Sequence, residues 1–487
     1  PIDLRFDVST RSRARAQLLH PAHVGLVVGA GLLVVAANRL GSAEGVVQPR
    51  IVIAVALLVI TCGQIALWPR RDNVFAYRQA GIYFTTLFIP LVGTATLTDY
   101  QPHILDLYAR VLAIGAIFFA GGLALGGHFA SRTRPRFTFT FGQSLAADGP
   151  AWRLLRRRTR IFTAMAAVAL LGSFALLRYV PLLAENRQFA KYGIGIYGPG
   201  FARGRLVYHF ALAIAGVVFP LSIIVAYRSR AFLDLALCGA VAMGLTASLS
   251  RGDAFAGPLL VLIAFAIGRK VAPTIIVAGV CVMFLGGALA NEFLFSSVKS
   301  APTLPARLAA SAPDVRDHLA FLTGFEREGS RPTHGRTLFA KLSSDGGEFD
   351  PAAYAIRLTT GITETHLLAS GGIRLPAPLW GFASFGFPGA AGFCLVSGLF
   401  IGWGTVRVRN AVTARRGDPH YWTNLLLGAV FFDGTFAFMA TFFFAPFADV
   451  VVFGVAVMVG LMPWAWVTRR TDGGGGDGRL ATTAAAV

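Results

Sequence analysis

Long apolar runs separated by short polar segments make up most of this chain. A transmembrane helix needs about 20 predominantly apolar residues. The pattern therefore predicts an all-α fold, a polytopic integral membrane protein with about twelve transmembrane helices. The twelve runs lie near 22–38, 51–68, 79–98, 104–127, 161–178, 206–227, 231–249, 252–268, 271–290, 378–405, 421–443 and 447–467.

Two longer polar stretches interrupt this pattern. The first, residues 179–205, separates the fifth and sixth runs, and the second, residues 291–377, separates the ninth and tenth. We therefore expect nine helices within 1–290, a large loop, and three further helices within 378–468. The Gly-rich remainder, 469–487, is expected to be a flexible solvated tail.

Composition agrees with a membrane protein. Charged residues make up 14% of the chain and the mean hydropathy is +0.62, whereas soluble domains average about 25% charged residues. The four cysteines lie inside apolar runs and show no CxxC spacing, so we expect small core residues and neither a disulfide nor a metal site. They are Cys62, Cys238, Cys281 and Cys394.

The net charge of +20 is distributed as membrane topology requires, which argues against nucleic acid as a partner. With the N-terminus in the cytoplasm, the cytoplasmic connections hold most of the Lys and Arg, as the positive-inside rule expects. This assignment predicts twelve spans with both termini cytoplasmic. It also places 179–205 and 291–377 on the outer face of the cytoplasmic membrane.

External positive charge is disfavoured by the same rule, and both external loops carry it. The first loop holds Arg187 and Arg203, and the second holds Arg327, Arg331 and Arg336. Guanidinium groups bind phosphate through a planar fork of donors. These arginines are therefore candidates for binding an anionic group such as a diphosphate. The alternative is that long translocated loops tolerate charge freely.

Arg251 lies in the short outer link between the seventh and eighth runs, within Ser248–Asp253. A charge at membrane depth usually faces a cavity or a partner, so Arg251 is a candidate for both catalysis and diphosphate binding. The alternative is a local pair with Asp253 or a residue that extends to the interface.

Three residues of the long loop are candidate general bases. His334 lies in a segment rich in Arg and Glu, and Glu364 and His366 precede the tenth run. Each side chain could accept the proton of a sugar hydroxyl. Taken singly, each could equally be a solvated loop residue.

Several motifs are absent from the sequence, namely HExxH, Walker A, GxSxG and clustered metal ligands. The first external loop, 39–50, is short and holds one acidic residue, Glu44. Classical polyprenyl-phosphate-sugar glycosyltransferases carry an acidic pair on a longer first loop, usually with a metal. We therefore expect no metal and no cofactor.

Taken together, these features resemble bacterial oligosaccharide repeat-unit polymerases (O-antigen polymerase-like) and, more distantly, O-antigen ligases. The resemblance rests on the number of spans, the largest external loop after the ninth, the loop around Arg187, and the Ser250-Arg251-Gly252 link. It also rests on Phe385-Gly386-Phe387-Pro388-Gly389 at the start of a late span. His366 stands roughly where ligases carry a histidine, but Leu367 replaces the asparagine that often follows it.

The resemblance implies a metal-independent transferase at the outer face of the cytoplasmic membrane. Its donor would be a glycan on polyprenyl diphosphate, and its acceptor a sugar hydroxyl of another lipid-linked glycan. Its partners would be membrane lipids and other envelope polysaccharide assembly proteins. A ligase-like or single-sugar transferase remains an alternative, and so does a transporter or flippase of lipid-linked glycans. Transporters tend to show internal repeats and charges within the membrane, whereas this sequence shows no convincing repeat and its charge concentrates at the outer face.

Overall fold

The computed structural model describes the middle of the chain and short parts of its C-terminal third. The predicted runs near 22–38, 51–68 and 79–98, and almost all of 447–467, lie outside the described residues. Those described are Val74, 101–132, 137–139, 149–193, 195–273, 275–276, 278–280, 282–283, 286, 315–339, 349–361, 375–411, 421–430 and 467–469.

Four described helices contain segments long and apolar enough to cross a membrane. They bear out the predicted helical fold class and indicate a membrane-embedded protein. At 1.5 Å per residue, a helix of 28 residues rises about 42 Å, which exceeds a hydrocarbon core of about 30 Å. The four are α6 (Pro102–Arg132), α8 (Pro150–Leu177), α10 (Gly198–Ser229) and α19 (Ala377–Ala411). Each overlaps a predicted run.

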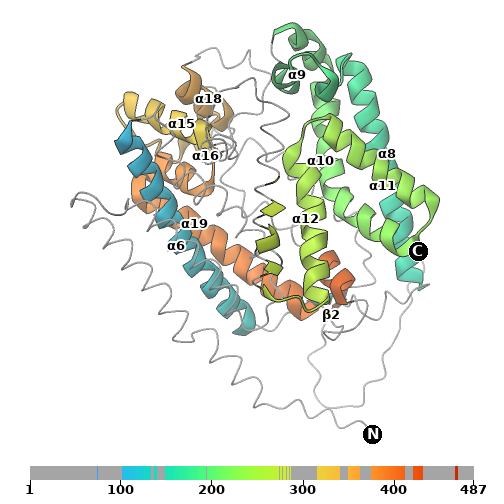
Figure 1. The fold of residues 1–487 in the computed structure, drawn as a ribbon. Coiled ribbons are helices and arrows are strands. Elements are labelled where there is room, and N and C mark those ends of the chain that lie inside the picture. The colour runs from blue at the N-terminus through green and yellow to red at the C-terminus, as the bar shows by residue number, and fades with distance from the viewer. Residues whose placement is uncertain are drawn as a thin grey trace.

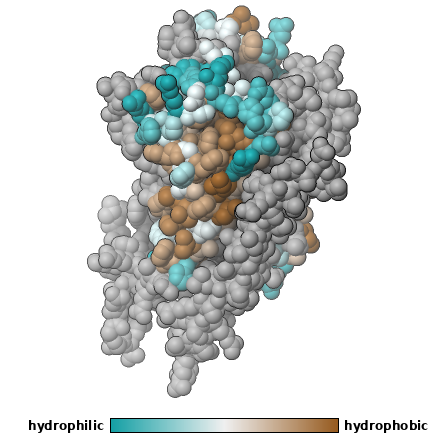
Figure 2. Space-filling view, turned by 90° about the vertical axis from the view of Figure 1, so that its left-hand side faces the viewer, coloured by the Kyte–Doolittle hydropathy of each residue, from teal (hydrophilic) through white to brown (hydrophobic). Residues whose placement is uncertain are grey.

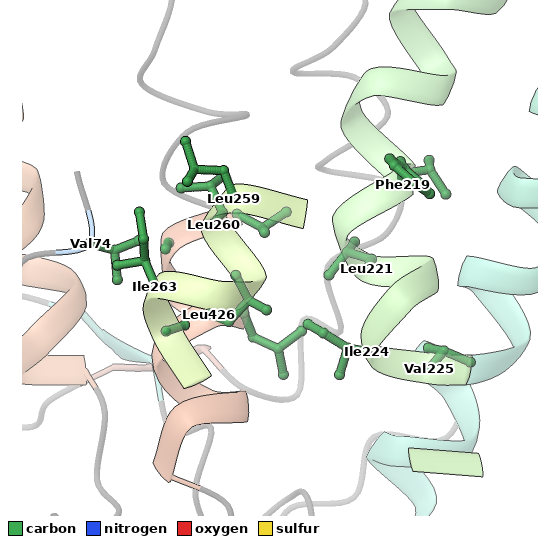
Figure 3. Packing of buried hydrophobic residues seen from close by; sticks show 14 of the residues in the cluster. Val74, Phe219, Leu221, Ile224, Val225, Leu259, Leu260, Ile263 and Leu426 are labelled. Carbon is green, nitrogen blue, oxygen red and sulfur yellow. The ribbon is translucent and has the colours of Figure 1, made fainter. Parts of the chain in front are cut away.

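The helices α8, α10, α11 (Phe232–Ala247) and α12 (Arg251–Gly268) follow one another along the chain and pack together. Non-glycine residues in the left-handed region end all four of them, with φ of 62° at Arg178, 50° at Arg230, 58° at Leu249 and 59° at Lys270. Apolar side chains fill the space between these helices and the helical residues 421–430. In Figure 3, side chains of α10 and α12 face each other, with Leu426 among them.

The helices α6 and α19 pack in parallel through glycines. Gly122 of α6 lies against Leu395 and Gly126 lies against Leu399, so contacts advance in the same direction on both helices. A Cβ atom on Gly122, Gly126, Gly398 or Gly402 would overlap a backbone carbonyl oxygen of the facing helix. Small residues four apart are typical of helix packing in membranes, because they let two backbones approach closely.

At one end of the bundle three further helices form a polar cap above α6 and α19 (Figure 1). They are α15 (Val315–Arg327), α16 (Arg336–Phe339) and α18 (Pro351–Thr360). The hydroxyl of Tyr108 lies 3.1 Å from Nδ1 of buried His318, which joins α6 to α15. Figure 2 shows hydrophilic residues gathered at this end and a hydrophobic surface below them.

At the opposite end, β1 (Phe137–Phe139) pairs antiparallel with β2 (Val467–Arg469), with Thr138 opposite Thr468. The pair joins the segment after α6 to the end of the last apolar run. The charge pattern predicts that both segments lie on the same side of the membrane.

Two helices begin earlier than the hydropathy predicts. The helix α8 begins at Pro150 and α10 begins at Gly198, whereas the runs start near 161 and 206. The reason at α8 is an ion-pair cluster, since Arg156 and Arg160 bind Asp234 of α11. Basic residues before an apolar run limit the run itself, but they do not limit the helix, because arginine is a good helix former.

Candidate functional site

The helix α19 is broken close to its start. Phe385 (φ −143°, ψ 19°) and Gly386 (φ 68°, ψ −154°) leave the helical conformation. In an unbroken helix, the carbonyl of Ser384 would accept the amide proton of residue 388. That residue is Pro388, which has no amide hydrogen. The motif identified in the sequence thus ends one helical segment and begins another.

A turn from the polar cap supplies the missing donors. The amide of Thr333 donates to the carbonyl of Ala383, and the amide of His334 donates to the carbonyl of Ser384, each at 2.9 Å. We call residues 327–336 the basic turn. Its backbone has φ values of 81° at Gly329, 52° at Ser330, 49° at His334 and 80° at Gly335. These left-handed positions turn the backbone back toward α19. The two hydrogen bonds to Ala383 and Ser384 then fix the position of the turn at the helix break.

The basic turn carries four of the predicted site residues. The side chains of Arg327, Arg331, His334 and Arg336 are all exposed. The guanidinium of Arg336 lies over the ring of Phe349, 5.2 Å from its centroid. An aromatic face restricts a guanidinium while leaving its N–H edge open. The structure therefore gathers these cations and the histidine on one short, anchored segment.

Buried hydroxyl groups lie beneath the turn. The side-chain oxygens of Thr333, Thr337 and Ser384 are buried and have no hydrogen-bond partner in the described part of the structure. A buried unsatisfied polar group costs about 1–3 kcal/mol.

The base of the turn is held by α15 and α18. A Cβ atom on Gly324 would overlap the carbonyl of Leu358, so the two helices cross in backbone contact. Arg357 binds Glu328 at 3.2 Å and lies over the ring of Tyr354, 5.3 Å from its centroid. Burial, reinforced by the charge of Glu328, raises the pKa of the Tyr354 phenol. The turn thus has rigid support on both sides.

The second group of predicted arginines lies in the α9 cap, which we define as residues 179–206 around α9 (Arg187–Tyr192). The side chain of Asn186 accepts the amide of Phe189 and so caps this helix. Exposed Arg187 donates from Nε to the carbonyl of Leu182 at 3.1 Å. Exposed Arg203 donates from Nε to the carbonyl of Pro199 at 3.2 Å.

The α9 cap has a small core of its own. The rings of Tyr179 and Tyr197 meet edge to face with centroids 4.9 Å apart. The hydroxyl of Tyr179 donates to the carbonyl of Ala190, and burial raises the pKa of this phenol to about 12. The core holds Arg187 and Arg203 on a folded unit.

The two groups of arginines lie at the same end of the bundle (Figure 1). The expectation that Arg187 completes the site of the long loop stays a prediction, because much of that loop lies outside the described residues.

The remaining predicted residues are only partly placed. Arg251 is the first residue of α12, after Ser250 at the N-cap, and its side chain lies outside what the structure describes. The link before it is fixed, because Tyr208 donates to the carbonyl of Ser248 at 3.0 Å. Glu364 and His366 lie outside the described residues.

The sequence analysis missed the buried acidic residue Asp234. Its carboxylate binds Arg156 and Arg160 of α8 and the hydroxyl of Ser229. The signal was present, since Asp234 is isolated among apolar residues and the two arginines are four apart, on one helix face. This cluster lies at the end of the bundle opposite to the polar cap and ties α8 to α11.

Comparison of the chain with protein-family models, curated proteins and solved structures finds no match. The functional proposals below therefore stand on sequence pattern and site geometry.

Proposed function

We propose that this protein is a membrane glycosyltransferase that polymerises polyprenyl-diphosphate-linked oligosaccharide repeat units. The proposed reaction takes place at the outer face of the cytoplasmic membrane and needs no metal. The proposal includes twelve spans, both termini in the cytoplasm, and residues 291–377 outside. The observation that carries it is the basic turn, which is hydrogen-bonded to the broken helix α19 and presents exposed Arg331, His334 and Arg336.

The chemistry needs positive charge where a leaving group develops negative charge. An acceptor hydroxyl attacks the anomeric carbon of the donor glycan, and the bond from that carbon to the diphosphate oxygen breaks. The diphosphate leaves with the bonding electrons, and the guanidinium groups of Arg331 and Arg336 stabilise its charge. Arg327, Arg187, Arg203 and Arg251 are the further proposed diphosphate ligands.

The acceptor hydroxyl loses its proton in the same step. His334 is the described candidate for the base, because its side chain is exposed on the basic turn. Glu364 and His366 are the other two candidates.

The same groups suit a ligase-like or single-sugar transferase, which would use the same donor with another acceptor. A transporter or flippase of lipid-linked glycans is favoured by one observation, the discontinuous helix α19. Transporters bind substrates between broken helices near the bilayer midplane. Here the break contacts the polar cap, so the transferase accounts better for its position.

The test is elongation of a polyprenyl-diphosphate oligosaccharide by the purified protein in proteoliposomes. We expect longer products that persist with a metal chelator and are abolished by Arg251→Ala and by Arg187→Ala. Full activity in both variants, or loss with chelator, would contradict the proposed site. Movement of the lipid-linked glycan across the bilayer without elongation would support the transporter.

A further inference from the structure

The α9 cap exposes large apolar side chains although the hydropathy pattern places it outside the hydrocarbon core. Leu183 is 81% exposed, Ile196 is 84% exposed, and Phe189 is also exposed. At the start of α10, Leu206 is 83% exposed. Single exposed apolar residues are ordinary, but four within one compact segment indicate a surface that contacts something apolar.

Cations accompany these apolar side chains. Arg187 precedes Phe189 within α9, and Arg203 precedes Leu206 and Phe210 on one face of α10, since these residues are three and four apart. Both arginines donate from Nε to carbonyls that lie earlier in the chain, at Leu182 and Pro199. The guanidinium of Arg203 is thus directed toward the start of α10. This is the behaviour of a cation that keeps its charge in the headgroup layer while neighbouring side chains contact lipid tails.

The length of α10 indicates where the lipid headgroup layers lie along this helix. Between Arg203 and Arg228 the helix rises about 38 Å, compared with about 30 Å for a hydrocarbon core and about 40–45 Å with the headgroups. At the far end, the guanidinium of Arg228 lies 4.3 Å from the ring centroid of Trp152. Tryptophan with arginine is typical of a membrane interface. The two arginines therefore mark the two headgroup layers. Gly193, which follows α9, lies against Phe201 of α10, so the end of α9 is close to the level of Arg203.

We infer that the α9 cap is an interfacial element that docks on the lipid bilayer itself. Leu183, Phe189 and Ile196 contact the upper acyl chains, and Arg187 lies at the level of the lipid phosphates. The match of exposed apolar groups with adjacent cations fits an anionic phospholipid surface, as in other interfacial helices. This inference needs a membrane-embedded chain and does not depend on the transferase chemistry.

The test measures the depth of spin labels in liposomes of phosphatidylethanolamine and phosphatidylglycerol. Labels are placed by Leu183→Cys and Ile196→Cys after the four native cysteines are replaced by alanine. Ser330→Cys, on the exposed basic turn, is the matched control. We expect labels at 183 and 196 to collide several-fold more often with oxygen than with a water-soluble nickel chelate, and the label at 330 to show the reverse. Equal nickel accessibility at all three positions would overturn the inference.

A second measurement needs no cysteine replacement. Ile196→Trp adds a fluorophore whose emission should be quenched by lipids brominated in the upper acyl chain, relative to the unsubstituted protein. No added quenching would overturn the inference. Protection of position 196 only at protein densities where two copies associate would also overturn it, in favour of a contact between copies.

Discussion

The backbone amide of His334 donates to the carbonyl of Ser384, in the place that the proline at 388 leaves empty. The contact links a candidate catalytic residue to the helix break through the main chain. A change in the break therefore changes the position of His334 without altering any side chain that could contact substrate. This coupling gives the first prediction.

Gly386→Ala should destabilise the protein and reduce activity, whereas Gly392→Ala should do neither. Gly386 has φ 68° and ψ −154°, a region essentially restricted to glycine, so alanine there costs about 1–3 kcal/mol. Gly392 lies in the same helix, and an added Cβ atom would meet nothing within 4 Å. Thermal unfolding in detergent and the elongation assay check both variants. Equal behaviour of the two would show that the break is not required.

Arg331→Ala and Arg336→Ala should each reduce elongation by about 10²–10³-fold, the range for losing one stabilising donor at a developing anion. Because both side chains are exposed, stability should change by about 0.5 kcal/mol or less. Arg153→Ala is the control, since Arg153 is exposed near the start of α8, in the segment that bears the Asp234 cluster. Elongation rates and melting temperatures of the three variants test this prediction. Undiminished rates in both site variants would remove the basic turn from the reaction.

Gly126→Ala should destabilise the parallel packing of α6 against α19, and Gly121→Ala should be tolerated. A Cβ atom at 126 would overlap the backbone of Leu399, whereas one at 121 would meet nothing within 4 Å. Overpacking costs about 1–3 kcal/mol, and a backbone obstacle cannot move aside as a side chain can. The comparison is made by thermal unfolding in detergent. A melting temperature for Gly126→Ala equal to that of Gly121→Ala would contradict the close approach.

Asp234→Ala should lower stability by about 2 kcal/mol. Breaking a buried ion pair by removing one partner costs about 3–5 kcal/mol. The side chains of Arg156 and Arg160 are 30% and 32% exposed, so water solvates them when Asp234 is removed and the loss of stability is smaller. The exposed neighbour Arg157 provides the control as Arg157→Ala. Denaturant unfolding measures both. If Asp234→Ala and Arg157→Ala were equally mild, the cluster would not hold α8 to α11.

Hydrophobic periodicity and length predicted the membrane helices that the structure describes, because burial in lipid imposes a simple apolar requirement. The same pattern could not locate the start of α8, since Arg156 and Arg160 in its first turns are bound by Asp234 in the folded chain. The acidic partner is 74 residues away from Arg160 along the chain. Tertiary contacts of this kind leave little local signal.

The candidate site was predictable in its residue types and not in its assembly. The sequence analysis placed the motif Phe385–Gly389 at the start of a late span without predicting a helix break, and it assigned Arg331 and Arg336 to an anion-binding loop. Their connection runs through the amides of Thr333 and His334, and a backbone donor has no sequence signature. The helix α15 also had a sequence signal, since Leu319, Leu322 and Phe325 recur at helical spacing and are buried. The polar composition of the loop obscured this signal.

Photo-crosslinking tests the central proposal, diphosphate recognition by the basic turn, most directly. A polyprenyl-diphosphate glycan with a diazirine next to the diphosphate is irradiated with the protein in proteoliposomes, and the labelled peptide is mapped by mass spectrometry. We predict labelling within residues 327–336 that falls when Arg331 and Arg336 are both replaced by alanine, and that is weak with the corresponding monophosphate. Labelling that avoids this segment, or that is equal for the two lipids, would contradict the proposal.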